Sequence, residues 1–189
     1  MNVDTSRDPN DLHPLLREAW EYLRDDFKRK WPDAPEPKLS ATYRGPIDQN
    51  RAFANGKSRH QYPESMHNHK PAFAFDIYFE EDRRAIWDWD LFERFAREAE
   101  RIGLFWGGRW PRLLDGPHFQ FKDVTGVHAR NGVVPHPPLI PKNGEQWKLV
   151  LMLDGRVVHS LPVPADMDVV TRVSQLKKRY YIDVRSSDA

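Results

Sequence analysis

The chain has 189 residues, which is enough for one compact domain with an appendage. Its 29 basic and 28 acidic side chains give a formal net charge of +1, without the basic excess that a nucleic-acid-binding surface requires. Cysteine is absent, which excludes disulfides and thiolate chemistry, so any metal site must be built from His, Asp and Glu.

Residues 1–20 carry charges throughout and lack the apolar segment of a signal peptide. No run of about 18 apolar residues occurs, so the sequence predicts no membrane insertion. We therefore expect a chain that is synthesised in the cytoplasm and has no obligate protein partner. Action outside the cytoplasm would then require a separate release route.

The first third of the chain predicts two helices and a strand. Apolar residues recur at three- and four-residue steps in the first segment, which is typical of a helix with one buried stripe. Asn10 or Asp11 is expected to cap this helix, and Pro32 to end it. The expected elements are a helix at Leu12–Trp31, a strand at Lys38–Tyr43 and a polar helix at Ile47–Ala54.

The middle of the chain predicts a buried strand, a strong amphipathic helix and a second strand. These elements are expected at Ala72–Phe79, Asp88–Ile102 and Phe119–Lys122, with an aromatic, glycine-rich segment at Leu104–Trp110.

The composition changes after Gly126, where four prolines fall between Pro135 and Pro141. Beyond them, a β-hairpin is expected from Lys148–Leu153 and Arg156–Leu161, and a third strand at Tyr180–Val184. The sequence thus predicts an α+β fold, with a small, largely antiparallel sheet and packed helices. The expected divisions are a first domain over residues 1–125, a proline-rich linker or wrapped segment over 126–146, and a β-rich extension of unknown role over 147–189.

One acidic residue, Asp76, interrupts the apolar run of the expected buried strand. A buried carboxylate is costly unless it is paired or bound to a cation. His67 and His69 lie upstream of it, and His118 lies downstream, three residues after Asp115. Two imidazoles and a carboxylate around an open fourth position are typical of a catalytic zinc, so we expect a Zn²⁺ site. The alternative is that Asp76 is bonded to backbone amides or to an arginine.

Several short motifs resemble the LAS metallopeptidases, the group of D-Ala-D-Ala carboxypeptidases and L-alanyl-D-glutamate endopeptidases that cut peptidoglycan stem peptides. The similarity covers about residues 39–121 and is nearest the phage endolysins. It rests on the segments Ala41-Thr42-Tyr43-Arg44, Ser65-Met66-His67-Asn68, Ala74-Phe75-Asp76, Trp106-Gly107-Gly108-Arg109-Trp110 and Asp115-Gly116-Pro117-His118-Phe119-Gln120.

The resemblance implies a role for each matched position. The implied zinc ligands are His67, Asp76 and His118; the implied catalytic residues are the general base Asp115 and Arg44; the implied substrate-binding residues are Tyr43, Gln49 and Trp106. The implied substrate is a peptidoglycan stem peptide. For Tyr43 the alternative is a half-buried core residue, and for Asp115 a turn-capping residue.

The first ligand departs from the family spacing, which places this histidine seven positions before the aspartate. His67 lies nine positions before Asp76, whereas His69 restores the spacing of seven. We favour His67, because Ser65 and Asn68 keep its flanking pattern, and His69 is the alternative ligand. The remaining histidines are interpreted as loop or surface residues: His13, His60, His128, His136 and His159.

The predicted function is therefore that of a zinc-dependent peptidoglycan endopeptidase of endolysin type, specific for the L-Ala-D-Glu bond. A D-Ala-D-Ala carboxypeptidase or dipeptidase on the same scaffold is the nearest alternative. A non-catalytic wall-binding or virion structural protein is the alternative from another class.

Overall fold

The structure is a computed structural model that describes residues 4–122, 138, 140, 148–153 and 156–162. The chain divides into two units, Met1–Leu139 and Ile140–Ala189. This division falls within the predicted linker segment 126–146, most of which lies outside the described residues.

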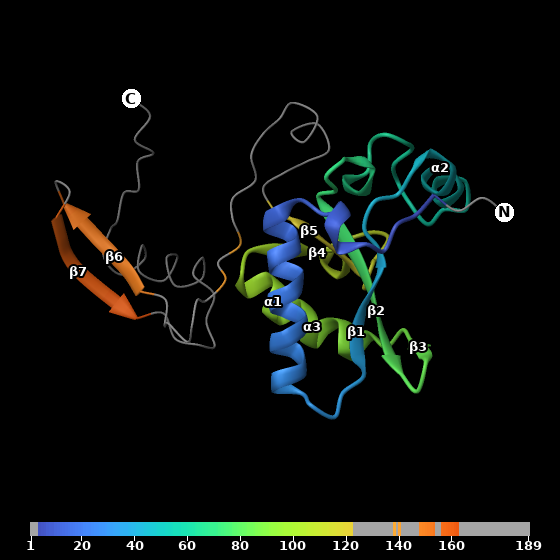
Figure 1. Ribbon diagram of the computed structural model, residues 1–189. Coiled ribbons are helices and arrows are strands. Elements are labelled where there is room, and N and C mark those ends of the chain that lie inside the picture. Colours follow the sequence, from blue (N-terminus) through green and yellow to red (C-terminus); the bar gives the residue numbers. More distant parts are fainter. Residues whose placement is uncertain (1–3, 123–137, 139, 141–147, 154–155, 163–189) are drawn as a thin grey trace. The chain divides into compact units, whose positions relative to one another are not determined.

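A five-stranded antiparallel sheet forms the centre of the first unit (Figure 1). Four strands lie in the order β1-β2-β5-β4, and β3 pairs with the far end of β2. The strands are β1 (Glu36–Ala41), β2 (Ala74–Glu81), β3 (Arg84–Ile86), β4 (Leu104–Trp106) and β5 (His118–Phe121). The α+β prediction is confirmed, although neither β3 nor β4 was predicted as a strand and β1 begins two residues before the expected strand.

The described helices follow the predicted segments closely: α1 (Pro14–Lys30), α2 (Pro46–Ala54) and α3 (Trp89–Arg101), with short 3-10 helices η1 (Pro9–Asp11), η2 (Met66–Asn68) and η3 (Gly107–Arg109). The predicted cap of α1 is wrong. His13 occupies the N-cap, where its Nδ1 accepts a hydrogen bond from the Leu15 amide at 3.3 Å. His13 is therefore half-buried rather than a surface residue, and its ring stacks on Phe73.

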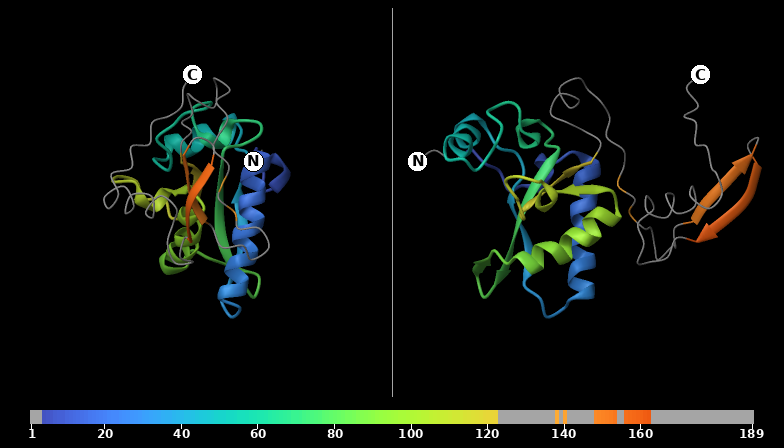
Figure 2. Two further views of the ribbon diagram at one scale, coloured as in Figure 1. Left: turned by 90° about the vertical axis from the view of Figure 1, so that its left-hand side faces the viewer. Right: turned by 180° about the vertical axis from the view of Figure 1, so that it is seen from behind.

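The two faces of the sheet have different roles because side chains alternate along each strand. Phe75 and Phe79 of β2 and Phe119 of β5 point toward α1 and α3, where they contact an aromatic cluster of both helices. Figure 2 shows these helices packed together against the sheet. Asp76 and His118 alternate with these aromatic residues, so they lie on the opposite face. The apolar run with one acid is thus a strand with a core face and a polar face.

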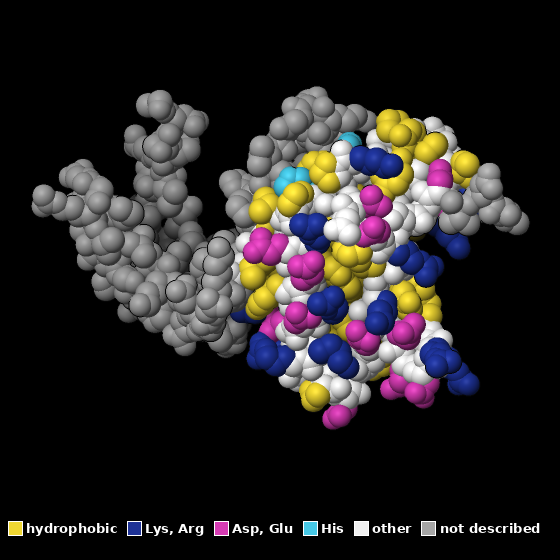
Figure 3. All heavy atoms as spheres, in the orientation of Figure 1, with side chains coloured by type: hydrophobic (Ala, Val, Ile, Leu, Met, Phe, Trp, Pro, Cys, Tyr) yellow, Lys and Arg dark blue, Asp and Glu magenta, His cyan; other side chains and the backbone are white. Residues whose placement is uncertain are grey.

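In the second unit, β6 (Lys148–Leu153) pairs antiparallel with β7 (Arg156–Pro162), as the hairpin pattern predicts. The turn between them and the predicted strand at Tyr180–Val184 lie outside the described residues, as do His128 and His136. No helix in the described part of the chain is long and apolar enough to cross a membrane. Basic and acidic side chains are intermixed on the described surface in Figure 3, in accord with the balanced net charge.

Candidate metal centre

Three side chains from distant parts of the chain meet on the polar face of the sheet. Asp76 and His118 are direct cross-strand partners of β2 and β5, which brings their side chains together. His67 arrives from η2, whose Ser65–Asn68 capping box fixes the short helix. His67 Nε2 lies 3.0 Å from Asp76 Oδ1, His118 Nδ1 lies 2.9 Å from the same oxygen, and the two nitrogens are 3.2 Å apart.

In each imidazole, the outer ring nitrogen, which is the one remote from Asp76, has a hydrogen-bond partner of its own. His67 Nδ1 lies 2.7 Å from the Thr42 carbonyl oxygen, and His118 Nε2 lies 3.0 Å from Gln120 Oε1. Because both partners are acceptors, each outer nitrogen must carry the proton and donate it. When a ring is neutral, its inner nitrogen keeps a lone pair that is directed toward Asp76 Oδ1; when the ring is protonated, the same nitrogen donates a hydrogen bond to that oxygen.

The two carboxylate oxygens of Asp76 face different partners. Oδ1 faces the imidazoles, while Oδ2 accepts a hydrogen bond of 2.7 Å from Arg44 Nη2. Arg44 is held by the backbone as well, because its amide donates to the His67 carbonyl at 2.9 Å. The ion pair therefore orients one carboxylate oxygen toward the two histidines.

The protonation states of the three residues are set by burial and by one another. Burial alone raises the pKa of Asp76, but His67, His118 and Arg44 outweigh it and hold that pKa well below its usual range. Burial lowers the pKa of His67. Burial also acts to lower the pKa of His118, but its hydrogen bond to Asp76 and the charge of that carboxylate outweigh it, so this pKa is raised. The site thus combines an ionised carboxylate with a His67 ring held neutral.

The donor set fits a divalent metal ion. The three potential ligand atoms all lie within 4.8 Å of one another, and no further residue of the described part of the chain belongs to this group. Ligand atoms of a tetrahedral zinc with bonds of about 2.1 Å lie about 3.4 Å apart. The three donors already approach this spacing, and two nitrogen lone pairs facing an anionic oxygen need a cation or a shared proton between them. His67, Asp76 and His118 can therefore hold a metal.

Asp115 lies on the tight turn that precedes β5, and two features hold this turn in place. Trp106 Nε1 donates to the Gly116 carbonyl at 2.7 Å. Gly107 lies so close to the turn that a Cβ there would come within 2.7 Å of the Asp115 carbonyl oxygen and 3.0 Å of His118 Cβ. Position 107 therefore requires glycine for this close approach.

The half-buried Asp115 carboxylate is electrostatically linked to the metal-binding group. Burial raises its pKa to about 6, and the charge of Asp76 contributes to the rise. Its side chain makes no hydrogen bond to any residue that the structure describes, so the turn-capping alternative finds no support there. A carboxyl group with a pKa near neutrality is suited to accepting and releasing a proton.

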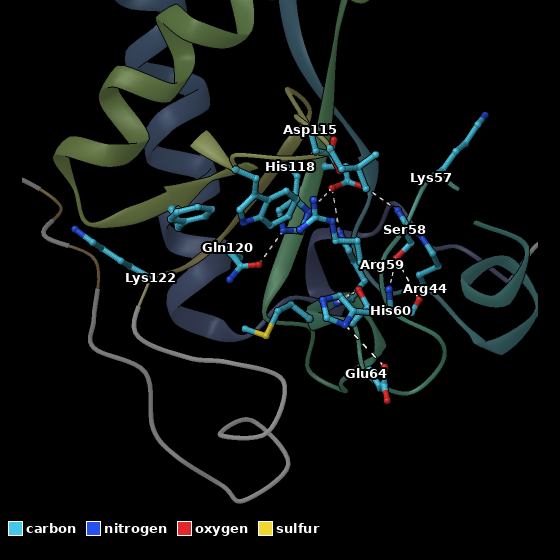
Figure 4. Close-up of a pocket in the computed structure, with 17 residues that line it drawn as sticks. Arg44, Lys57, Ser58, Arg59, His60, Glu64, Asp115, His118, Gln120 and Lys122 are labelled. Carbon is cyan, nitrogen blue, oxygen red and sulfur yellow. Dashed lines mark hydrogen bonds and ion pairs between the residues drawn. The ribbon is translucent and has the colours of Figure 1, made fainter. Parts of the chain in front are cut away.

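The metal-binding group lies in a pocket with a volume of about 430 Å³ (Figure 4). Its wall includes the expected catalytic residues Arg44 and Asp115. The segment 57–60 also lines it, and includes His60, which was interpreted from the sequence as a loop residue. Phe105 and Trp110 supply apolar surface beside His118, and the Trp110 ring lies 5.0 Å from the His118 ring.

Three residues expected to bind substrate lie outside the pocket wall. Trp106 is buried and holds the Asp115 turn. Gln49 is buried too, and its Nε2 donates to Ser58 Oγ at 3.0 Å and to the His60 carbonyl at 2.6 Å. Tyr43 is half-buried with Lys70 Nζ over its ring, which agrees with the core alternative. The substrate-binding roles of these three residues therefore stay predictions from the resemblance.

The structure brings His67, rather than His69, to Asp76 and His118. His69 follows η2 as its C-cap, and its ring packs edge-on against Phe73 at 5.5 Å. The extra residues between His67 and Asp76 are taken up by η2 and the bend that leads into β2.

Comparison with known proteins places the chain among peptidases. Residues 54–121 match the peptidase family described as D-alanyl-D-alanine carboxypeptidase. The matched segment contains all three members of the metal-binding group and Asp115. Over 128 residues the chain is 24% identical to the peptidoglycan L-alanyl-D-glutamate endopeptidase CwlK of Bacillus subtilis (strain 168), covering 59% of this chain and 74% of that protein. These matches support an LAS-type peptidase. The solved structure of the Serratia marcescens L-Ala D-Glu endopeptidase ChiX aligns with 71% of this chain and 93% of its own, at 23% identity and a TM-score of 0.46.

The sequence analysis missed two hydrogen-bond partners of the metal-site histidines, Gln120 and Thr42. Gln120 could have been predicted, because residues two apart on a strand lie on the same face and Gln120 follows His118 by two positions. Thr42 acts through its backbone carbonyl, so its side chain gave no signal.

Proposed function

We propose that the chain is a zinc-dependent peptidoglycan endopeptidase that hydrolyses the L-Ala-D-Glu bond of stem peptides. The observation that carries the proposal is the convergence of His67 Nε2, His118 Nδ1 and Asp76 Oδ1, at 2.9–3.2 Å from one another, in the wall of a pocket. The bond specificity is supported by the printed activity of the Bacillus subtilis relative.

Zinc, when bound by these three residues, supplies the Lewis acidity that activates water and polarises a carbonyl. Asp115 then serves as the general base, since its raised pKa lets it accept a proton from the attacking water and pass it to the leaving amine. Arg44 commits one N–H to Asp76, and a guanidinium has five. Its remaining donors can bind the carbonyl oxygen of the scissile bond as negative charge develops there.

The proposal is tested by metal analysis of the purified protein together with product masses from digested peptidoglycan. We expect about one zinc per chain, loss of activity with a chelator and recovery on adding zinc. The products should carry a new amino terminus on D-glutamate. A metal-free chain with full activity would contradict the zinc assignment.

A second candidate is a D-Ala-D-Ala carboxypeptidase or dipeptidase, which the description of the matched family favours. The same digestion separates the two, because this activity releases free D-alanine and leaves the L-Ala-D-Glu bond intact. The endolysin-like route to the wall, through holes made by a holin, belongs to the proposal and is supported by the motif resemblance alone.

A further inference from the structure

The segment that joins α2 to η2 brings an unneutralised cation to the pocket. Arg59 lines the pocket and is exposed to solvent. Within the described residues, no acidic side chain forms an ion pair with it. Of the carboxylates that line the pocket, Asp76 bonds Arg44 and both histidines, and Glu64 lies 3.9 Å from His60 Nδ1. The third, Asp115, forms no ion pair with Arg59 within the described residues. Figure 4 shows Arg59 on the same side of the pocket as Arg44, across from Gln120 and Lys122.

The residues on either side of Arg59 are held by hydrogen bonds from a buried side chain. Gln49 donates to the residues on either side of Arg59, at Ser58 Oγ and the His60 carbonyl. Its own Oε1 accepts from Asn68 Nδ2 at 3.4 Å, and the same nitrogen donates to the Arg44 carbonyl at 2.7 Å. The segment is thus linked through one hydrogen-bond network to Arg44 and to η2, which bears His67. Such preorganisation lowers the entropic cost of binding a ligand with Arg59.

A guanidinium with free N–H donors is suited to a carboxylate, which it can bind through two parallel hydrogen bonds. The proposed substrate supplies one close to the scissile bond. In a stem peptide, D-glutamate is joined onward through its side-chain carboxyl group, so its α-carboxylate remains free. That group is attached to the carbon that bears the scissile nitrogen.

We propose that Arg59 is a specificity-determining residue that binds the free α-carboxylate of D-glutamate and thereby selects acidic over amidated stem peptides. Gln49 is the positioning residue that presents it. This inference rests on the proposed endopeptidase function, and it predicts discrimination between D-glutamate and D-isoglutamine, in which an uncharged carboxamide replaces the carboxylate.

The test uses two peptides, N-acetyl-L-Ala-γ-D-Glu-L-Lys amide and its D-isoglutamine counterpart, so that no other carboxylate is present. We expect the zinc-loaded full chain to cleave the acidic peptide with a kcat/KM on the order of tenfold higher, as a charge-assisted hydrogen bond at a partly exposed site contributes. In Arg59→Gln this ratio should fall to about one. Arg59→Lys, which keeps the charge but loses the planar fork, should give an intermediate ratio.

Arg84→Gln is the matched control, because Arg84 is an exposed arginine of β3, outside the pocket wall. It removes the same charge and should leave the ratio at its original value. General damage to the enzyme lowers both rates together and leaves the ratio unchanged, so a ratio that persists in Arg59→Gln overturns the inference. Equal cleavage of both peptides by the unmodified chain overturns it too, while leaving the proposed function intact. If the chain cleaves neither peptide, both the proposed function and this inference are contradicted.

Discussion

The Nδ1 atom of His67 donates its proton to the Thr42 carbonyl oxygen at 2.7 Å, immediately beyond the end of β1. This bond sets the tautomer of a buried ring and leaves Nε2 as the atom directed at Asp76. A main-chain carbonyl cannot be removed by a side-chain substitution, so the orientation of His67 is built into the path of the backbone. The corresponding bond of His118, to Gln120, depends on a side chain and can be tested directly.

The choice between the two neighbouring histidines has a clear expected outcome. His67→Ala should lose most of the bound metal and the activity, because three protein ligands leave little redundancy. His69→Ala serves as the matched control and should keep most of both, since His69 lies outside the metal-binding group. The metal content of both variants is measured by atomic absorption. If His67→Ala retains its metal and His69→Ala loses it, the ligand is His69 instead of His67.

Gln120→Ala should weaken metal binding without removing any ligand. The substitution takes away the acceptor that holds the His118 Nε2 proton, and loss of such outer partners typically costs about 10- to 100-fold in metal affinity. Competition with a chelator of known affinity measures the change. An unaltered affinity would mean that strand pairing alone orients the His118 ring.

Asp115→Asn should separate the general base from a turn-stabilising residue. The amide keeps the shape of the side chain but cannot accept the water proton, so we expect normal metal content and a loss of at least about 100-fold in kcat. Steady-state kinetics on a soluble stem peptide measures this. A rate near that of the unmodified chain would require another base.

The same substitution should change the pH dependence of stability in the metal-free protein. The folded-state pKa of Asp115 is about 6 and its ordinary value is 3.8, so the folded state holds its proton more tightly than the unfolded state. The resulting stabilisation is present below about pH 4 and is lost as the pH rises through about 6. Metal-free Asp115→Asn should therefore melt above the unmodified chain at about pH 8, with the difference shrinking toward about pH 4. A difference independent of pH would contradict the raised pKa.

Trp106→Phe should act through the turn rather than through substrate binding. It removes the donor to the Gly116 carbonyl, and an unsatisfied buried acceptor costs about 1–3 kcal/mol of stability. Because this turn carries Asp115, kcat should fall while KM changes little. Thermal melts and a full kinetic analysis check both effects; a selective rise in KM would instead support the substrate-binding role that the resemblance implies.

The helices and most strands were predictable because their signals are local. The apolar stripe of α1, the Asp88 cap of α3 and the glycine after it act within a few residues. The lone acid in β2 was visible for the same reason. The C-terminal part of the second unit, by contrast, lies outside the described residues, so its predicted strand stays a prediction.

The sequence by itself determined which residue types could form the site: a carboxylate in an apolar run, histidines on either side of it, and an aspartate on a turn. Only the tertiary structure decided which atoms meet. The pairing of β2 with β5 places Asp76 opposite His118, and the bond from His67 to Thr42 brings in a ring from η2 rather than His69. The same packing buries Trp106 and Gln49, whose side chains donate hydrogen bonds to the Gly116 and His60 carbonyl groups. Such contacts join segments far apart in the chain, and their geometry depends on the packing of the whole unit, which no local pattern contains.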